Sequence, residues 1–388
     1  MGRLLTQRDS ADIVIVENRH QPDAIPLYAR LDPAPLARIG VAAGDPEQEF
    51  GRISRALLLS EDRILIADGQ AHQLSLFSFD GDRLWSFGRE GEGPGEFHSL
   101  GQVELGPGDT VAVWDRRNRR LTLADSRSDG FRDFFLTTEE HGDPASVEAL
   151  PNGGYLGGFH READGVEKGG GLLLRTDSVL LALLEESGRV EAVFGPFLGG
   201  ESLTRTQSGG EMMLFLQMSL PFSRSLSWDV HGDELFVGEN GTFEIEVFGL
   251  DGRLRRLLRV PALSRPLTEE DIQGLKEERY AGTDGSPEAR ERVAERIDDA
   301  PKPELRPAFS TLTVDEGGRL WVKEYRPRPG QEITWWVFSS HGELLGSVHL
   351  PPDTDVHHIG DGLILLQPPH ELDVPMLQVH RLIRAGDR

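Results

Sequence analysis

A strand–turn–strand unit recurs along the chain and constrains its fold more than any other feature. Its clearest copies span 74–87, 244–254 and 335–345, and each joins two runs of alternating apolar and polar residues through a glycine-containing turn. Weaker copies turn at 128–130 and 186–188. Glycine supplies the positive φ that a tight hairpin requires, and a period of two places one face of each strand inward. The unit therefore predicts repeated β-hairpins.

Each of these hairpins follows another one, so the full unit has four strands. For example, the alternating segment 56–60 turns into 64–68 just before the unit that begins at residue 74. Four strands in about 45–50 residues, once insertions are removed, is the spacing of a β-propeller blade. We expect six blades, and the ranges that they span are approximately 52–88, 98–137, 145–195, 223–260, 308–350 and 355–383.

One strand near the N-terminus has no hairpin partner of its own. The sequence pattern of residues 36–40 is similar to that of 84–88, the last strand of the first blade. The last blade is one strand short. Because an open ring leaves an unpaired strand edge, we expect 35–42 to close it. The fold class is therefore all-β, a six-bladed β-propeller closed by an N-terminal strand. A single domain would occupy 1–388, with 1–34 as an N-terminal segment.

Two stretches of sequence add a resemblance to a known family. The loop Gly88-Arg89-Glu90-Gly91-Glu92-Gly93-Pro94-Gly95-Glu96-Phe97 resembles the blade-to-blade loop of NHL-type six-bladed propellers. Arg8-Asp9-Ser10-Ala11, followed by Ile15-Val16-Glu17-Asn18, resembles the start of bacterial exported six-bladed β-propeller proteins, an NHL/TolB-like group. The resemblance implies the same fold and export to the periplasm or cell surface, although the N-terminal residues lack the apolar stretch of a signal peptide. It implies no particular activity.

Composition narrows the classes of partner. The chain has 41 Lys and Arg against 65 Asp and Glu, a net charge of −24, which disfavours nucleic acid and anionic membranes. It has no cysteine, and hence no disulfide framework and no thiolate nucleophile. No window approaches the roughly 18–20 apolar residues of a membrane span. The glycine-rich loop 88–97 lacks the Lys-Ser/Thr of a phosphate-binding loop, so we expect no cofactor.

Long segments interrupt the blade pattern on one face of the expected propeller. They are 160–171, 196–221 and 261–307. The last carries helix-start signals at Thr268 and Ser286, which predict a small helical insertion between blades four and five. This insertion could be a lid or a partner-binding arm, or simply a solvated segment packed on the propeller rim.

Arginines gather on loops of the same face despite the acidic total. Guanidinium groups suit carboxylates and phosphates, so such a face could select a small anion or an acidic peptide. The alternative is that the arginines pair with neighbours such as Asp115 and Asp125. The candidate ligand-binding residues are Arg52, Arg55, Arg116, Arg117, Asn118, Arg119 and Arg326.

The leading functional hypothesis is a non-catalytic recognition module that binds a protein, a peptide or a small anionic ligand on the loop-elaborated face. No catalytic residue set is evident. A structural scaffold without a specific ligand cannot be separated from this hypothesis by sequence.

The alternative is a metal-dependent hydrolase similar to gluconolactonase-like propellers, with a divalent cation in the central channel acting as a Lewis acid. Asp229 and Asp315 are expected at strand ends remote from the elaborated face, which weakens this alternative. Neighbours in a strand point to opposite faces, so at most one residue of the pair His357-His358 should face the channel. The carboxylates that inner strands could offer a cation are Glu104, Glu148, Asp229 and Asp315.

Overall fold

Blade one shows how the sequence builds each blade in the structure, a computed structural model. β5 (Ile53–Leu59), β6 (Arg63–Asp68), β7 (Gln73–Ser78) and β8 (Arg83–Phe87) pair antiparallel in chain order. β6 is buried along its whole length, whereas β8 alternates between half-buried and exposed side chains. The structure describes residues 5–10, 13–41, 44–106, 110–127, 130–150, 153–161, 165–169, 172–209, 212–325, 330–369 and 374–386.

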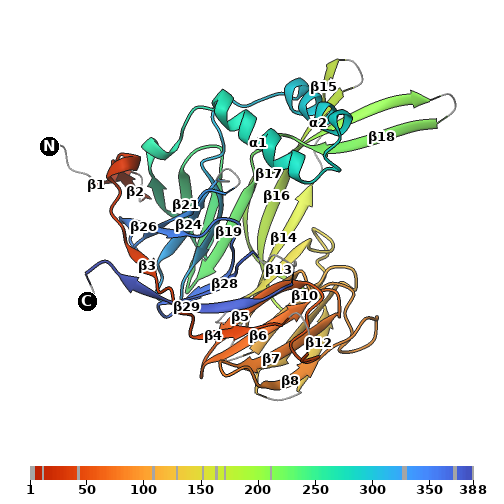
Figure 1. Cartoon of the computed structure of the whole chain (residues 1–388), viewed down its shortest axis with the longest axis vertical. Helices are drawn as coiled ribbons and strands as arrows, with labels where there is room; N and C mark the ends of the chain where they lie inside the picture. Colours follow the sequence, from red (N-terminus) through yellow and green to blue (C-terminus); the bar gives the residue numbers. More distant parts are fainter. Residues whose placement is uncertain are drawn as a thin grey trace.

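The strands form six sheets that surround a common axis, which confirms the predicted six-bladed β-propeller (Figure 1). Blade two contains β9 (Gln102–Leu105), β10 (Thr110–Asp115), β11 (Arg120–Asp125) and β12 (Phe131–Phe135). Blade four contains β19 (Leu226–His231), β20 (Glu234–Glu239), β21 (Glu244–Gly249) and β22 (Leu254–Arg259). Blade five contains β23 (Phe309–Val314), β24 (Leu320–Glu324), β25 (Ile333–Phe338) and β26 (Leu344–Leu350).

The N-terminal part of the chain closes blade six. This blade contains β27 (Asp355–Gly360), β28 (Leu363–Gln367) and β29 (Leu377–Arg384). β4 (Ala37–Ile39) and β3 (Ala29–Leu31) both pair antiparallel with β29, and Ile39 lies opposite Leu377. Ile39 is fully buried in the apolar cluster between blades six and one. The predicted closure by an N-terminal strand is confirmed.

A hairpin that the sequence analysis did not foresee covers the outer edge of blade four. β1 (Leu5–Ser10) and β2 (Ile13–Asn18) pair antiparallel, and β2 then pairs in parallel with β22. Asn18 is fully buried, donates to the carbonyl oxygen of Gly342 at 2.9 Å and accepts from the N–H of Leu344 at 2.9 Å. The hairpin thus ties blade four to the last turn of blade five.

Blade three extends beyond the propeller as an arm of long strands (Figure 1). Its strands are β13 (Ser146–Ala149), β14 (Tyr155–Arg161), β16 (Leu172–Leu184) and β17 (Val190–Gly209), with β15 (Val166–Gly169) and β18 (Met212–Ser219) paired along the extension. The segments 160–171 and 196–221, to which the sequence analysis assigned no secondary structure, therefore contain strands. β15 pairs with β16, and β17 pairs with both β16 and β18, so β16 lies between the two insertions and their backbone groups are paired within one sheet.

The helical insertion between blades four and five has the predicted form. α1 (Glu269–Ala281) begins at a capping box, in which the Thr268 side chain accepts from the backbone N–H of Asp271, and α2 (Pro287–Asp299) begins after Ser286. Leu275 and Ile297 pack with Phe222 in a small apolar cluster, so the insertion is attached to the propeller. Short 3-10 helices occupy Pro22–Ala24 and Pro261–Leu263. Within the described residues, no helix is long and apolar enough to cross a membrane.

Candidate functional site: the central cavity

A cavity of about 280 Å³ lies where the first strands of all six blades meet, and we call it the central cavity. Each first strand contributes to its wall because the first strand is the innermost strand of its blade. Glu104 lies opposite Ala112 and Glu148 lies opposite Leu156 in their sheets, so both acids occupy regular strand positions. The polar lining residues are Arg55 (β5), Glu104 (β9), Glu148 (β13), Asp229 (β19), Thr311 and Thr313 (β23), and His357 and His358 (β27).

Arg55 and Glu104 form an ion pair across two neighbouring blades. The Arg55 Nη2 and Glu104 Oε2 atoms are 3.1 Å apart, and about a third of each side chain remains exposed. Burial raises the pKa of Glu104, the Arg55 guanidinium opposes that rise, and Asp229 adds to it. The guanidinium therefore stabilises a carboxylate that the cavity would otherwise favour in its neutral form.

Glu148 and Asp229 form a second pair of acids, without a cation of their own beside them. Burial raises the pKa of Glu148 well above its ordinary value, and the charges of Asp229 and Glu104 raise it further. Burial also raises the pKa of Asp229, although hydrogen bonds from Thr313 and Val314 oppose this. Asp229 Oδ2 accepts from Thr313 Oγ1 and from the Val314 N–H, both at 2.7 Å, so Asp229 also links blade four to blade five.

Both histidines of the pair His357-His358 line the central cavity, so the expectation that at most one would do so was wrong. The β27–β28 ladder has a register shift between Val356 and His358, but adjacent residues also line the cavity on the regular β19 ladder, namely Trp228 and Asp229. Alternation along a strand therefore does not decide which side chains reach the cavity. His358 Nδ1 accepts from the N–H of Leu58 at 3.1 Å, and burial lowers the pKa of His358 to about 4. Burial lowers the pKa of His357 as well, so neither ring favours a charge at neutral pH.

Two buried hydrogen-bond donors that belong to residues lining the cavity have no partner in the described part of the chain. Trp335 lines the central cavity and is only 3% exposed, and its indole N–H is buried without an acceptor. Arg55 Nε is buried and unpartnered in the same way. Buried donors in native proteins almost always find an acceptor, so the cavity has hydrogen-bonding capacity in reserve.

Among the candidate residues that the structure describes, only Arg55 lines the central cavity. Arg52, Arg116 and Arg117 are exposed, and Arg119 Nη1 is 3.3 Å from Asp143 Oδ2. Arg326 lies outside the described residues. Ligand binding by these residues therefore stays a prediction.

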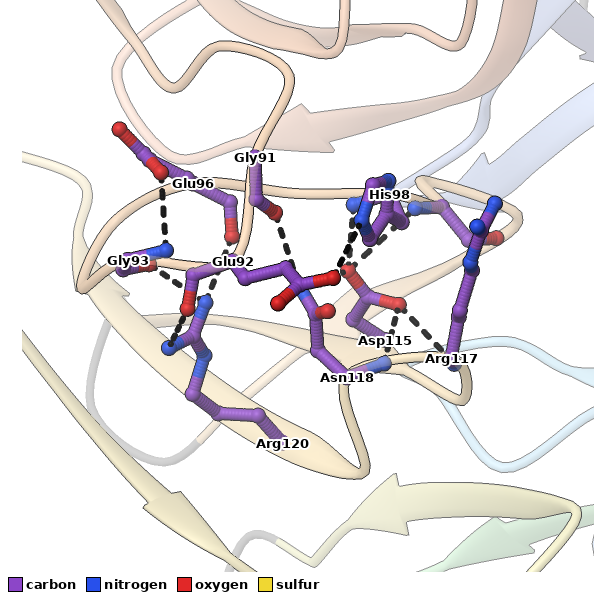
Figure 2. A network of polar contacts seen from close by, with 10 residues as sticks. Gly91, Glu92, Gly93, Glu96, His98, Asp115, Arg117, Asn118 and Arg120 are labelled. Carbon is purple, nitrogen blue, oxygen red and sulfur yellow. Dashed lines mark hydrogen bonds and ion pairs between the residues drawn. The ribbon is translucent and has the colours of Figure 1, made fainter.

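The loop around Asn118 is organised by backbone groups (Figure 2). The Asp115 carboxylate accepts from the backbone N–H groups of His98, Arg117 and Asn118 at 2.6, 3.1 and 3.2 Å. The Asn118 side chain donates to the carbonyl oxygen of Gly91 and to Asp115, both at 3.0 Å. Asp115 thus pairs with the backbone of the arginine-rich turn and shapes the turn, while the side chains of Arg116 and Arg117 stay exposed.

Three of the four carboxylates considered as metal ligands do converge, because Glu104, Glu148 and Asp229 line one cavity. Asp315 does not join them, since its carboxylate accepts from Arg319 Nε at 2.7 Å and from the Trp321 indole at 2.9 Å. Among the described residues, no group of three or more His, Asp or Glu is arranged to hold a metal ion.

A wider hollow of about 880 Å³ lies between blades three and four and residues 301–305 of the insertion. Three of its glutamates have partners: Glu201 pairs with Arg224, Glu244 pairs with Arg259, and Glu239 accepts from the N–H of Leu198. Glu246 also lines the hollow, and burial and the charges of Glu244 and Glu239 raise its pKa. The central cavity is the stronger candidate because the first strands of all six blades contribute polar side chains to it.

Comparisons with known proteins support the fold and leave the activity open. No family model matches the chain. A probable nicotinate-nucleotide adenylyltransferase of Opitutus terrae is 30% identical over 134 residues, which is 33% of this chain and 63% of that protein. The chain therefore spans less than two thirds of the curated relative that it matches.

Solved structures resemble the whole propeller. A Bacteroides fragilis chain whose name describes it as an exported protein has a TM-score of 0.50 at 11% identity, covering 95% of this chain and 99% of that one. A member of the DUF4221 family from Bacteroides vulgatus has a TM-score of 0.51 at 11% identity, covering 92% and 99%. At such identities the likeness concerns the fold alone. The fold class and the likeness to exported propellers are thus supported, whereas the family itself is not identified.

Proposed function

We propose that the protein is a non-catalytic binding protein that recognises a small polar ligand in its central cavity. The observation that carries this proposal is the convergence of polar side chains from the first strands of all six blades on one cavity. Groups held on strands of a closed ring are well fixed, as a binding site requires. Unpartnered donors in the wall add support, because a ligand could supply the missing acceptors.

The size of the cavity limits the ligand. Pockets for drug-sized molecules are about 300–1,000 Å³, and the central cavity is slightly smaller at about 280 Å³. The ligand would therefore be a small molecule. A protein or peptide partner could reach the cavity only with a single inserted side chain or chain end.

The exposed arginines define a second surface for the same recognition role. We propose that Arg52, Arg116, Arg117 and Arg119 meet a small anion or an acidic peptide on the loop-elaborated face. Two observations support this. These side chains are exposed, and Arg52 and the Arg116–Arg119 turn belong to the neighbouring blades one and two. Arg326 was predicted for the same surface from its sequence position.

A metal-dependent hydrolase is the second candidate, favoured by the convergence of three carboxylates. Glu104, Glu148 and Asp229 would have to move closer together to hold the cation, since no three acids of the described residues are arranged as metal ligands, and a bound cation would supply Lewis-acid chemistry. The charge on Arg55 opposes this candidate, because a guanidinium paired with Glu104 repels a divalent cation and occupies one of its ligands.

A thermal melt of the EDTA-treated protein tests the proposal. The protein is screened with a set of neutral, cationic and anionic small molecules, and separately with Ca²⁺, Mg²⁺ and Zn²⁺. A ligand at a hundred times its Kd stabilises the native state by about 2.7 kcal/mol. We expect a saturable rise in Tm with at least one organic compound, reduced in Glu148→Gln and retained in the surface control Glu186→Gln. A rise with metal alone would favour the hydrolase, and no rise with any compound would contradict the binding function.

A further inference from the structure

The central cavity has more acidic than cationic side chains on one side. Arg55 is the one cationic residue among the described residues that line it, and it pairs with Glu104. Both histidines favour their neutral forms. Glu148 and Asp229 are therefore left without a cationic partner of their own, which is a costly arrangement for buried acids.

The two acids are not equivalent. Asp229 already accepts hydrogen bonds from Thr313 and Val314 through Oδ2, and from its neighbour Val230 through Oδ1. Glu148 lies close enough to Asp229 and to the backbone of Val230 for both to affect its pKa, and it has fewer fixed donors around it. Glu148 is thus the acceptor with capacity to spare, and Asp229 fixes its position.

Two residues that line the same cavity carry hydrogen-bond donors that lack an acceptor. The buried indole N–H of Trp335 is a donor without an acceptor, and so is the Nε–H of Arg55. A second tryptophan, Trp228, also lines the cavity beside Asp229 and offers an aromatic ring. Aromatic rings attract organic cations, most strongly in sites shielded from water.

We propose that the central cavity binds a small primary amine that also carries a hydrogen-bond-accepting oxygen. Its ammonium group lies at Glu148, supported by Asp229 and Trp228, and its oxygen accepts from the indole N–H of Trp335. An ammonium group donates three hydrogen bonds and brings one positive charge, which matches the unpaired acids. The inference rests on the proposed binding function and names its ligand class.

Matched pairs of compounds test the ligand class. In each pair the two molecules differ chiefly by one amino group: ethanolamine and ethanediol, 4-aminobutanoate and butanoate, glucosamine and glucose. Titration calorimetry with the full chain at pH 7.5 should show at least tenfold tighter binding of the amine in at least one pair. Equal affinities within every pair, or no binding by any of the three amines, would overturn the proposal.

Three variants assign the binding to the cavity. Glu148→Gln keeps the shape but cannot form a carboxylate, and we expect the amine to bind about tenfold more weakly. Trp335→Phe removes the indole N–H, and we expect a loss of about fivefold. Glu186→Gln removes a surface carboxylate and should change nothing. Unchanged amine binding in both cavity variants would contradict the assignment, provided that their circular dichroism matches that of the wild type.

The outcomes also separate this inference from the binding function. If a neutral or anionic compound of the thermal screen binds in a way that Glu148→Gln or Trp335→Phe weakens, and no amine binds, the ligand class is wrong while the binding function stands. If no compound of either set binds, both fail.

Discussion

The guanidinium of Arg55 on β5 lies 3.1 Å from the carboxylate of Glu104 on β9, and so joins blades one and two inside the central cavity. Three further pairs act between blades nearby. Asp229 on blade four accepts from Thr313 and Val314 on blade five, and His358 on blade six accepts from Leu58 on blade one. Residues that shape the cavity therefore also hold the ring together.

Replacing Arg55 by Met should lower the free energy of unfolding by about 1–2 kcal/mol at pH 7, below the cost for a fully buried pair because a third of each side chain is exposed. Glu104 would lose its cation, and its pKa would rise further. Because a protonated Glu104 needs no cation, the loss should be smaller at pH 5. Urea unfolding at both pH values measures this, with Arg55→Lys as the control. An equal loss at both pH values would contradict the account.

Glu316 predicts a pH dependence of stability. Burial, Asp361 and Asp315 together raise its pKa to about 7, whereas an unfolded chain titrates near 4.3. The native state therefore binds a proton that the unfolded state lacks between these values. This contribution to stability is present at low pH and is lost as pH rises through about 7. Glu316→Gln should remove it.

Thermal melts at pH 5.5 and pH 8 provide the measurement. For each protein, we compare the Tm at pH 5.5 with the Tm at pH 8. The Tm at pH 5.5 minus the Tm at pH 8 should be larger in the wild type than in Glu316→Gln. Glu343→Gln, at an exposed turn position, is the matched control. Identical pH profiles for wild type and Glu316→Gln would count against the raised pKa.

Arg120 holds the glycine-rich loop of blade two in place (Figure 2). Its buried guanidinium donates to the carbonyl oxygens of Glu92, Gly93 and Glu96 at 3.1, 2.5 and 2.8 Å. Arg120→Met leaves these acceptors unpaired and should cost about 2–4 kcal/mol, with faster amide exchange in the loop. Arg117→Met, at an exposed site, should cost less than about 0.5 kcal/mol. Similar effects of the two variants would refute this role.

Ile39 tests the closure of the ring. It is fully buried between blades six and one, so Ile39→Ala should reduce the free energy of unfolding by about 2–4 kcal/mol. Leu36 precedes the same strand and is 39% exposed, so Leu36→Ala should have a much smaller effect. Chemical denaturation distinguishes them, and a mild effect of Ile39→Ala would mean that the closing strand contributes little.

The blades and their closure could be predicted because both depend on local signals. Alternation within strands and glycine at hairpin turns are visible in short stretches, and the spare strand at 36–40 matched a missing one at the end of the chain. The parallel pairing of β2 with β22 and the arm on blade three could not be predicted. The first joins segments far apart in the chain, and the second consists of hairpins within and beside insertions that the sequence analysis read as loops.

The site was predictable only in pieces. Glu104, Glu148 and Asp229 stood out as acids on inner strands, and Arg55 as an arginine at the start of one. Their meeting depends on the curvature of the closed ring, so the sequence suggested a metal site and an anion site where the structure forms a single mixed cavity. The place of both histidines could not be predicted from alternation, because adjacent residues of an inner strand, such as Trp228 and Asp229 on β19, line the same cavity.

The most direct test of ligand binding in the central cavity is an NMR titration of the ¹⁵N-labelled indole groups. The chain has six tryptophans, and only Trp228 and Trp335 line the cavity. Trp85 and Trp321 donate to Ser126 and Asp315 at 3.2 and 2.9 Å and serve as internal references. With the tightest-binding compound of the thermal screen, the signals of Trp228 and Trp335 should move while those references stay still. Unmoved signals for Trp228 and Trp335 at saturating ligand would contradict the central claim.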